Sequence, residues 1–252
     1  LTDLFKEGFV PTDASPIVRD TCSRFEDVIN AYPSDQFARN LSAAQAAHVR
    51  RIDVRPTSIE RSGVHASEYL HCQLFGNFVT TPMPQVKATD GDLEFARSRL
   101  AKLGDGPKVV IHPGSGSPNK CWPIEGFAAS ADRLAADGWG VLFVLGEAER
   151  ERIDPEQTRQ LADRYEKVDD LTLDQLVGVL ASADAYLGND SGPTHLAAAV
   201  GTPTVTLFGP TNAVIWAPRG PKVNVLQGAR SGEGDWRIKP EAVVDAIKSV
   251  VN

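Results

Sequence analysis

The residues with the clearest potential for chemistry run from Gly188 to His195, in the order Gly-Asn-Asp-Ser-Gly-Pro-Thr-His. An apolar segment precedes them and apolar residues follow, so the pattern predicts a strand that leads through a polar turn into a helix. The amide groups at a helix start are unpaired and the helix dipole is positive there, which favours a phosphate group. Gly188 and Gly192 allow positive φ and close approach of a ligand, and Ser191 can cap the helix while it donates to an anion. A structural turn needs one glycine and one cap, so the additional polar residues, including Asp190, favour a ligand phosphate.

A second polar loop, His112–Pro123, follows the apolar segment Val109–Ile111. In an open parallel sheet, ligands bind beyond the carboxyl ends of the strands, where this loop must lie. Gly114 and Ser115 offer amide and hydroxyl donors, and Lys120 supplies a mobile positive charge on an exposed loop. We favour ligand contact, with a flexible surface loop and a solvated lysine as the alternative. The spacing is not that of a Walker A loop.

Other polar and aromatic residues follow predicted strands. Glu147 comes just after 141–145, where a carboxylate can accept two hydrogen bonds from a ribose diol; a solvated glutamate at a helix start is nearly as good an interpretation. The segments Phe208–Thr211 and Trp216–Pro218 could form the wall of a base or sugar pocket, or belong to the core.

The sequence Asp90-Gly-Asp92 could hold a divalent ion on a diphosphate. No strand precedes it, however, and Asp92 suits the cap of a helix that begins at Leu93, so we interpret it as a helix cap. Asp169-Asp170 is interpreted in the same way. The chain has no HExxH, CxxC or GxSxG arrangement, which argues against zinc and serine hydrolases, and we predict no metal site.

The elements expected to position these residues alternate between apolar strands and amphipathic helices. Strands are predicted at 109–111, 141–145, 185–187, 204–208 and 223–226, and helices at 124–136, at 172–181 with Thr172 as cap, and from Pro240. This alternation predicts a Rossmann-like domain over 107–252, with a doubly wound parallel sheet. Residues 1–106 are less regular and form a partial α/β domain and linker, with a strand or short helix at 25–29, helices at 43–50, 67–75 and 93–103, and a connection at 80–89.

Composition narrows the class of protein. The chain has 252 residues, of which 42% are hydrophobic, and a net charge of −7. The negative charge and the lack of a basic run argue against nucleic-acid binding. Cys22, Cys72 and Cys121 are isolated, which suggests reduced thiols in a cytosol-like compartment. No apolar run approaches membrane-spanning length.

Five short motifs occur in a fixed order: His112-Pro-Gly-Ser, Lys120-Cys-Trp-Pro, Leu145-Gly-Glu, Gly188–Leu196 and Leu207-Phe-Gly-Pro. Together they resemble the glycosyltransferase family 9 heptosyltransferases, which transfer heptose from ADP-heptose onto the inner core of bacterial lipopolysaccharide. The resemblance is strong over residues 107–226 and weak before them.

The resemblance implies a GT-B fold, in which two Rossmann-like domains face each other and the C-terminal one binds the nucleotide sugar. It implies that Lys120 contacts the diphosphate, that Glu147 binds the ribose, and that the start of the 192 helix holds the diphosphate and sugar. It also implies that no metal or other cofactor is needed. The predicted donor site consists of His112, Gly114, Ser115, Lys120, Glu147, Asp190, Ser191, Gly192 and His195.

One departure from the family concerns the general base. Family members begin with an apolar strand and a Gly-Asp turn, whose aspartate is the base implied for the acceptor hydroxyl. No such arrangement precedes residue 107, and the single methionine is Met83, so Leu1 is not a translational start. We therefore expect the base upstream of Leu1, and an acceptor half that is incomplete in this sequence.

These observations predict an inverting, metal-independent glycosyltransferase that moves a heptose-like sugar from a nucleotide diphosphate sugar, ADP-heptose by resemblance, to a lipopolysaccharide core acceptor. Lys120 would stabilise the leaving diphosphate. The expected location is the cytoplasm, with a peripheral contact to the inner membrane left open. Two alternatives remain: a GT-B nucleotide-sugar epimerase and a non-catalytic nucleotide-sugar binding module.

Overall fold

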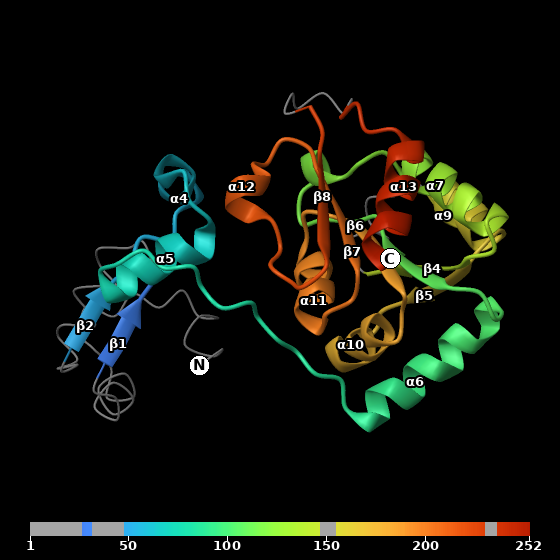
Figure 1. Ribbon diagram of the computed structural model, residues 1–252, viewed down its shortest axis with the longest axis horizontal. Helices are drawn as coiled ribbons and strands as arrows, with labels where there is room; N and C mark the ends of the chain where they lie inside the picture. The colour runs from blue at the N-terminus through green and yellow to red at the C-terminus, as the bar shows by residue number, and fades with distance from the viewer. Residues whose placement is uncertain (1–26, 32–47, 147–154, 230–235) are drawn as a thin grey trace. The chain divides into compact units, whose positions relative to one another are not determined.

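The computed structural model describes residues 27–31, 48–146, 155–229 and 236–252 (Figure 1). The chain divides into two compact units, Leu1–Thr81 and Pro82–Asn252. Glu147 lies outside the described residues, as do Cys22 and residues 43–47 of a predicted helix.

The second unit is built on a six-stranded sheet in which all neighbouring strands are parallel. The strand order is β5-β4-β3-β6-β7-β8. The strands are β3 (Lys108–His112), β4 (Gly140–Leu145), β5 (Glu166–Asp169), β6 (Ala185–Asn189), β7 (Thr204–Phe208) and β8 (Val223–Gln227). The predicted parallel sheet is confirmed.

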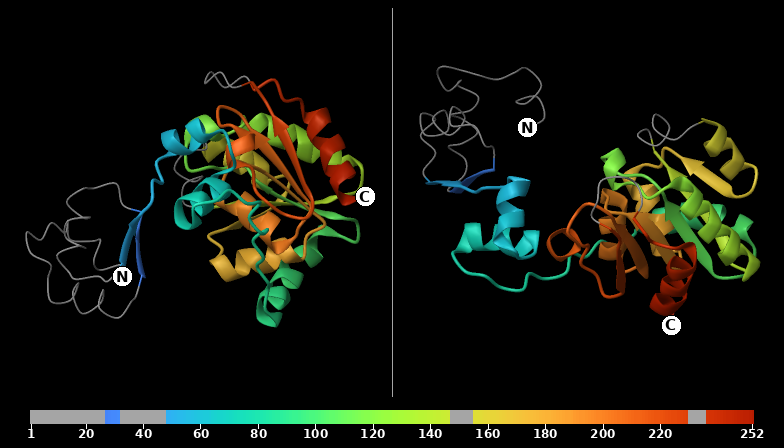
Figure 2. Two further views of the ribbon diagram at one scale, coloured as in Figure 1. Left: turned by 60° about the vertical axis from the view of Figure 1, so that its left-hand side comes forward. Right: turned by 90° about the horizontal axis from the view of Figure 1, so that it is seen from above.

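Helices cover both faces of this sheet (Figures 1 and 2). They are α6 (Asp90–Leu100), α7 (Ile124–Ala136), α9 (Pro155–Ala162), α10 (Leu173–Ala181), α11 (Gly192–Val200), α12 (Ala213–Trp216) and α13 (Pro240–Val251), with short 3₁₀ turns η1 (Ala101–Leu103) and η2 (Pro118–Lys120). Val109 and Ile111 of β3 pack in a core with α7 and α13, whereas Val110 packs in a second core with α6, α10 and α11. A strand buried on both faces is apolar throughout, which is why β3 shows no alternation in the sequence.

The segment before residue 107 contributes α6 to the second unit, although the sequence pattern grouped it with the N-terminal part. Ala96 and Leu100 of α6 are buried in the second core. Gly178 of α10 approaches the backbone of Asp92 so closely that a Cβ there would overlap it. Helix α6 therefore belongs to the second unit because it crosses α10 tightly, and the spacing of apolar residues in α6 does not reveal this crossing.

The start of α6 also differs from the prediction. The helix begins at Asp90, not Leu93, and its cap is Thr89, whose side chain accepts from the amide of Asp92. Asp92 in turn accepts from the Thr89 amide at 2.8 Å, which completes a capping box. Thr172 caps α10 with a similar box, as predicted, so Asp169-Asp170 is not the cap.

The first unit contains two parallel strands, β1 (Asp27–Asn30) and β2 (His48–Arg51), then α4 (Pro56–Ser62) and α5 (Ala66–Phe75). The helix predicted over 43–50 is wrong for its last three residues, because His48–Arg50 pair with β1. Tertiary pairing overrides local propensity here.

The strand β5 and the helices α9 and α12 of the second unit were not predicted from the sequence. Strand β5 carries a single buried residue, Val168, and so gives little apolar signal.

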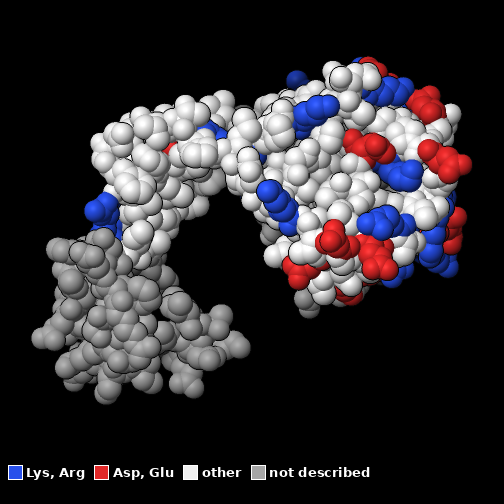
Figure 3. All heavy atoms as spheres, turned by 60° about the horizontal axis from the view of Figure 1, so that its bottom comes forward, with Lys and Arg blue, Asp and Glu red and all other residues white. Residues whose placement is uncertain are grey.

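Charged side chains on the surface are mixed in sign. On the face in Figure 3, Lys and Arg side chains of the second unit are interspersed with Asp and Glu. Exposed pairs such as Lys248–Asp137, at 2.6 Å, are each worth about 0–1 kcal/mol at most. The two apolar cores, not these pairs, therefore hold the second unit together.

Candidate functional site

The candidate site lies where the sheet reverses its winding. The order β5-β4-β3-β6-β7-β8 changes direction between β3 and β6. Ligands of open α/β sheets bind in the crevice beyond the carboxyl ends of the two strands at such a reversal. His112 at the end of β3 is in register with Gly188 near the end of β6, so the two loops predicted to bind a ligand begin side by side. Gly146 follows β4 at the same edge, which places the third predicted loop there as far as it is described.

Asn189 ties these two loops together. Its side chain is fully buried. Its Oδ1 accepts from the amide of Trp122 at 3.0 Å, and its Nδ2 donates to the carbonyl of Pro113 at 2.7 Å. Both ends of the 113–122 loop are therefore fixed by one amide side chain. The sequence pattern marked Asn189 only as part of a polar turn. The signal available in the sequence was its place at the end of a predicted strand.

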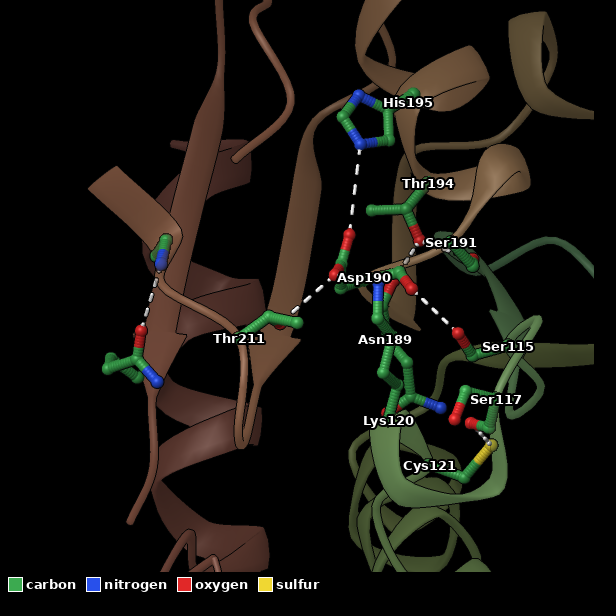
Figure 4. A network of polar contacts seen from close by, with 12 residues as sticks. Ser115, Ser117, Lys120, Cys121, Asn189, Asp190, Ser191, Thr194, His195 and Thr211 are labelled. Atoms are coloured by element: carbon green, nitrogen blue, oxygen red, sulfur yellow. Dashed lines mark hydrogen bonds and ion pairs between the residues drawn. The ribbon is translucent and has the colours of Figure 1, made fainter. Parts of the chain in front are cut away.

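Asp190 is the centre of the polar network (Figure 4). The Lys120 ammonium donates to its Oδ2 at 2.8 Å, and the Thr211 hydroxyl donates to the same oxygen at 3.0 Å. Its carbonyl accepts from Ser115 Oγ at 2.7 Å. Three loops, following β3, β6 and β7, thus converge on one aspartate. Lys120 lies in an ion pair with a carboxylate that is only 8% exposed, and so is not the freely solvated lysine that an exposed loop suggests.

The electrostatics of Asp190 keep it ionised. Burial raises the pKa of the carboxyl, but the contacts with His195, Lys120 and Thr211 and the charge of Lys120 outweigh burial and hold the pKa below its ordinary value of 3.8. His195 Nε2 is 3.9 Å from Asp190 Oδ1, which is an electrostatic contact and too long for a hydrogen bond. At neutral pH the site therefore pairs one carboxylate with one ammonium.

The turn into α11 is held by hydroxyl groups. Thr194 Oγ1 donates to the carbonyl of Asn189 and lies 3.1 Å from the Tyr186 hydroxyl and 3.0 Å from Ser191 Oγ. Ser191 occupies the N-cap position, but the prediction that its side chain caps the helix is wrong, because its hydroxyl contacts Thr194 and not a backbone amide. The cap side chain therefore leaves the first amide groups of α11 to other acceptors, which is the arrangement that an anion can use.

The two glycines of this turn serve different purposes. Neither Gly188 nor Gly192 uses the positive φ that glycine allows. Gly188 is required by space, because a Cβ would lie closer than 3.0 Å to the Tyr186 hydroxyl and to Thr194 Oγ1. Gly192 faces open space, since no atom lies within 4 Å of a Cβ built there. The close approach predicted for a ligand is therefore geometrically open at Gly192.

The two histidines also differ. His112 is buried, and its Nδ1 lies 3.0 Å from the carbonyl of Val144. A carbonyl can only accept, so Nδ1 carries the proton and braces the end of β3 against β4. His195 is on the first turn of α11 with 48% of its side chain exposed, at the rim of the site. Gly114 is buried, and its carbonyl is 3.4 Å from Asn189 Nδ2.

Metal ligands do not gather in the described residues: no group of three or more His, Cys, Asp or Glu side chains there could hold an ion. Asp90 and Asp92 belong to the first turn of α6, as described above. Cys72 and Cys121 are free thiols.

The first unit has a pocket of about 270 Å³ beside the end of β2, lined by Ala31, Arg51, Ile52, Asp53, Val54, Arg55 and Gln73. Asp53 would be the natural candidate there for a base. Its Oδ1 accepts from Arg55 N and Nε at 3.0 and 2.9 Å, and its Oδ2 accepts from Arg55 Nη2 and from Ser58 Oγ. These hydrogen bonds, with the Arg55 side chain first, hold the pKa of Asp53 well below its usual range. Both oxygens of the Asp53 carboxylate are thus occupied by donors from Arg55 and Ser58.

The chain is similar in sequence to proteins of one known family. The model of glycosyltransferase family 9 (heptosyltransferase) matches residues 31–238. Lipopolysaccharide heptosyltransferase 1 of Pseudomonas aeruginosa is 37% identical over 155 residues, which cover 60% of this chain and 41% of that protein. The chain spans about two fifths of the length of the curated relatives it matches.

Two solved structures share the fold. The glycosyltransferase family 9 protein of Veillonella parvula superposes with a TM-score of 0.71 at 20% identity, over 93% of this chain and 76% of that one. Escherichia coli ADP-heptose lps heptosyltransferase II gives a TM-score of 0.66 at 21% identity, over 93% of this chain and 80% of that one. The predicted GT-B type fold is confirmed by these likenesses.

Proposed function

Because the chain belongs to glycosyltransferase family 9, we propose that its second unit binds ADP-heptose and that the protein transfers the heptose to a lipopolysaccharide core acceptor. The observation that carries this proposal is the convergence of Lys120, Asp190 and the start of α11 at the reversal point of the sheet. An ammonium and the unpaired amides of a helix start are the groups that bind a diphosphate without a metal. The relatives' names support heptose as the sugar.

The transfer that we propose is inverting and metal-independent. The acceptor hydroxyl attacks the anomeric carbon from the face opposite the diphosphate and gives its proton to the general base, which is expected upstream of Leu1. The bond from carbon to the leaving oxygen breaks, and negative charge develops on ADP. Lys120 and the amides at Ser191 and Gly192 would stabilise that charge, which is the role of preorganised donors in such transition states. Glu147 is proposed to bind the ribose, His112, Gly114 and Ser115 to shape the loop around the diphosphate, and His195 to contact the sugar side.

Binding can be tested by titration calorimetry of ADP into the 252-residue chain, with excess EDTA and with magnesium. We expect the same affinity in both buffers and a preference for ADP over UDP. Replacing Lys120 by alanine should weaken ADP binding by about 1.5–3 kcal/mol, the range for hydrogen bonds to charged groups. A requirement for magnesium would refute metal independence, and an unchanged affinity would remove Lys120 from the site.

Transfer is tested separately, with ADP-heptose and a lipopolysaccharide core acceptor, by following ADP release. Release that depends on the acceptor supports the transferase. Because the general base is expected upstream of Leu1, the assay also uses the full gene product, and ADP binding with no release by that protein would favour a nucleotide-sugar binding module. No helix in the described part of the chain is long and apolar enough to cross a membrane. We propose a cytoplasmic enzyme, with a peripheral contact to the inner membrane where its acceptor is anchored.

A further inference from the structure

Thr211 lies in the loop that follows β7, and this loop is firmly held. Gln227 Nε2 donates to the carbonyls of Phe208 and Gly209 at 3.2 and 2.9 Å. The indole of Trp236, which is only 2% exposed, covers Gly209 so closely that a Cβ there would overlap the ring. Thr211 therefore reaches Asp190 from a rigid support, not from a mobile loop.

The hydroxyl of Thr211 and the ammonium of Lys120 share one oxygen, Asp190 Oδ2. Figure 4 shows Thr211 approaching Asp190 from a different element than the 115–121 loop. We propose that Thr211 is a positioning residue: it fixes the rotation of the Asp190 carboxylate and thereby holds the Lys120 ammonium where the donor's diphosphate binds. This inference rests on the proposed function, since it assigns a role toward the same diphosphate.

The physical argument starts from the carboxylate torsion. The last torsion of an aspartate is broad, so a carboxylate held by one partner can turn. Oδ2 has its second partner in Thr211, whereas Oδ1 has His195 at 3.9 Å, too far for a hydrogen bond. Lys120 is 35% exposed and has a flexible stem. The position of its ammonium therefore depends on how firmly the Asp190 carboxylate is held.

The consequence is specific to phosphate. If the Thr211 hydroxyl is lost, the Lys120 ammonium samples more positions, and the interaction with a diphosphate weakens. Contacts of the nucleoside do not pass through Asp190 Oδ2 and should be unaffected. A merely structural role would instead weaken every ligand, because the whole loop would shift.

The test compares Thr211→Val, which keeps the shape and removes the hydroxyl, with Thr211→Ser, which keeps the hydroxyl. For Thr211→Val we expect ADP affinity to fall about three- to tenfold, which is less than a direct hydrogen bond to a charged group is worth because Thr211 acts through Asp190, and adenosine affinity to stay within error. Thr211→Ser should bind ADP like the wild type.

A double-mutant cycle with Lys120→Gln completes the test, since coupled residues give non-additive effects. In that background Thr211→Val should cause no further loss of ADP affinity. Additive losses, or an equal loss for adenosine and ADP, would overturn the proposal. If the wild-type chain binds ADP and Thr211→Val binds it equally well, the positioning role of Thr211 is refuted and the proposed function stands. If the wild-type chain does not bind ADP, the proposed function itself is refuted.

Discussion

Replacing Lys120 by alanine leaves the buried Asp190 carboxylate without its ammonium partner. The two groups are 2.8 Å apart, and the aspartate side chain is 8% exposed while the lysine is 35% exposed. Asp190 would keep the Thr211 hydroxyl and the more distant His195. The carboxylate stays out of water, so it cannot recover in solvent what it loses in the pair.

The size of the effect follows from this partial compensation. Breaking a fully buried ion pair by removing one partner costs about 3–5 kcal/mol. Because Lys120 is a third exposed and Thr211 remains, we expect about 2 kcal/mol, close to one hydrogen bond to a charged group. For a domain of this size that corresponds to a fall in Tm of about 4–8 °C. An exposed-loop lysine would have given a change close to zero.

The assay is thermal unfolding without ligand at pH 7, followed by circular dichroism. The control is Lys102→Ala, at an exposed lysine of η1, which should change stability by less than about 0.5 kcal/mol. The double variant Lys120→Ala with Asp190→Asn should be more stable than Lys120→Ala alone, because the uncompensated charge is gone. A single variant that melts like the Lys102 control, or a double variant that melts lower still, would refute the ion-pair reasoning.

Three further outcomes are expected of the ligand-free protein. Because the folded-state pKa of Asp190 is lowered, its contribution to stability is present above the ordinary carboxyl value of 3.8 and is lost as pH falls below it. Unfolding curves from pH 6 to pH 2.5 should therefore show that Asp190→Asn lacks this part of the acid-induced loss of stability. An identical loss in the variant and the wild type would contradict the assignment. Gly188→Ala should destabilise by about 1–3 kcal/mol by overpacking against the Tyr186 hydroxyl and Thr194. Adding Tyr186→Phe should relieve part of that cost in urea titrations, and no relief would point to another obstacle. Thr172→Ala should cost about 1 kcal/mol through the lost cap of α10, and a neutral result would show that the capping box adds nothing.

The parallel sheet and the place of the site could be predicted because both depend on local patterns. Strands buried on both faces are continuous apolar runs, and β3 and β4 show them most clearly. Loops that follow such strands must lie at one edge of the sheet. The edge strand β5 escaped prediction for the converse reason, since a strand with one buried side chain carries no such pattern.

What the sequence could not provide is the pairing of side chains within the site. Lys120 and Asp190 are 70 positions apart, and Thr211 is another 21 beyond Asp190. Each residue was visible as polar and near a strand end, but which donor reaches which oxygen depends on the register of β3 with β6 and on the path of the loop that Asn189 fixes. Gly188 illustrates the same limit: its presence suggested unusual backbone torsions, whereas its reason is the Tyr186 hydroxyl, a neighbour on the same strand face.

The network also explains how the proposed diphosphate site can contain an aspartate at its centre. An isolated buried carboxylate would repel a diphosphate, but this one receives an ammonium and a hydroxyl on the same oxygen. Asp190 thus orients a cation instead of adding a free negative charge, and its lowered pKa keeps it ionised in that role at neutral pH. A diphosphate arriving at the start of α11 would meet the far side of the Lys120 ammonium, which still has donors to offer, because an ammonium carries three. Binding then requires no rupture of the ion pair, which is why Lys120 can contribute to stability and to the proposed charge stabilisation at once.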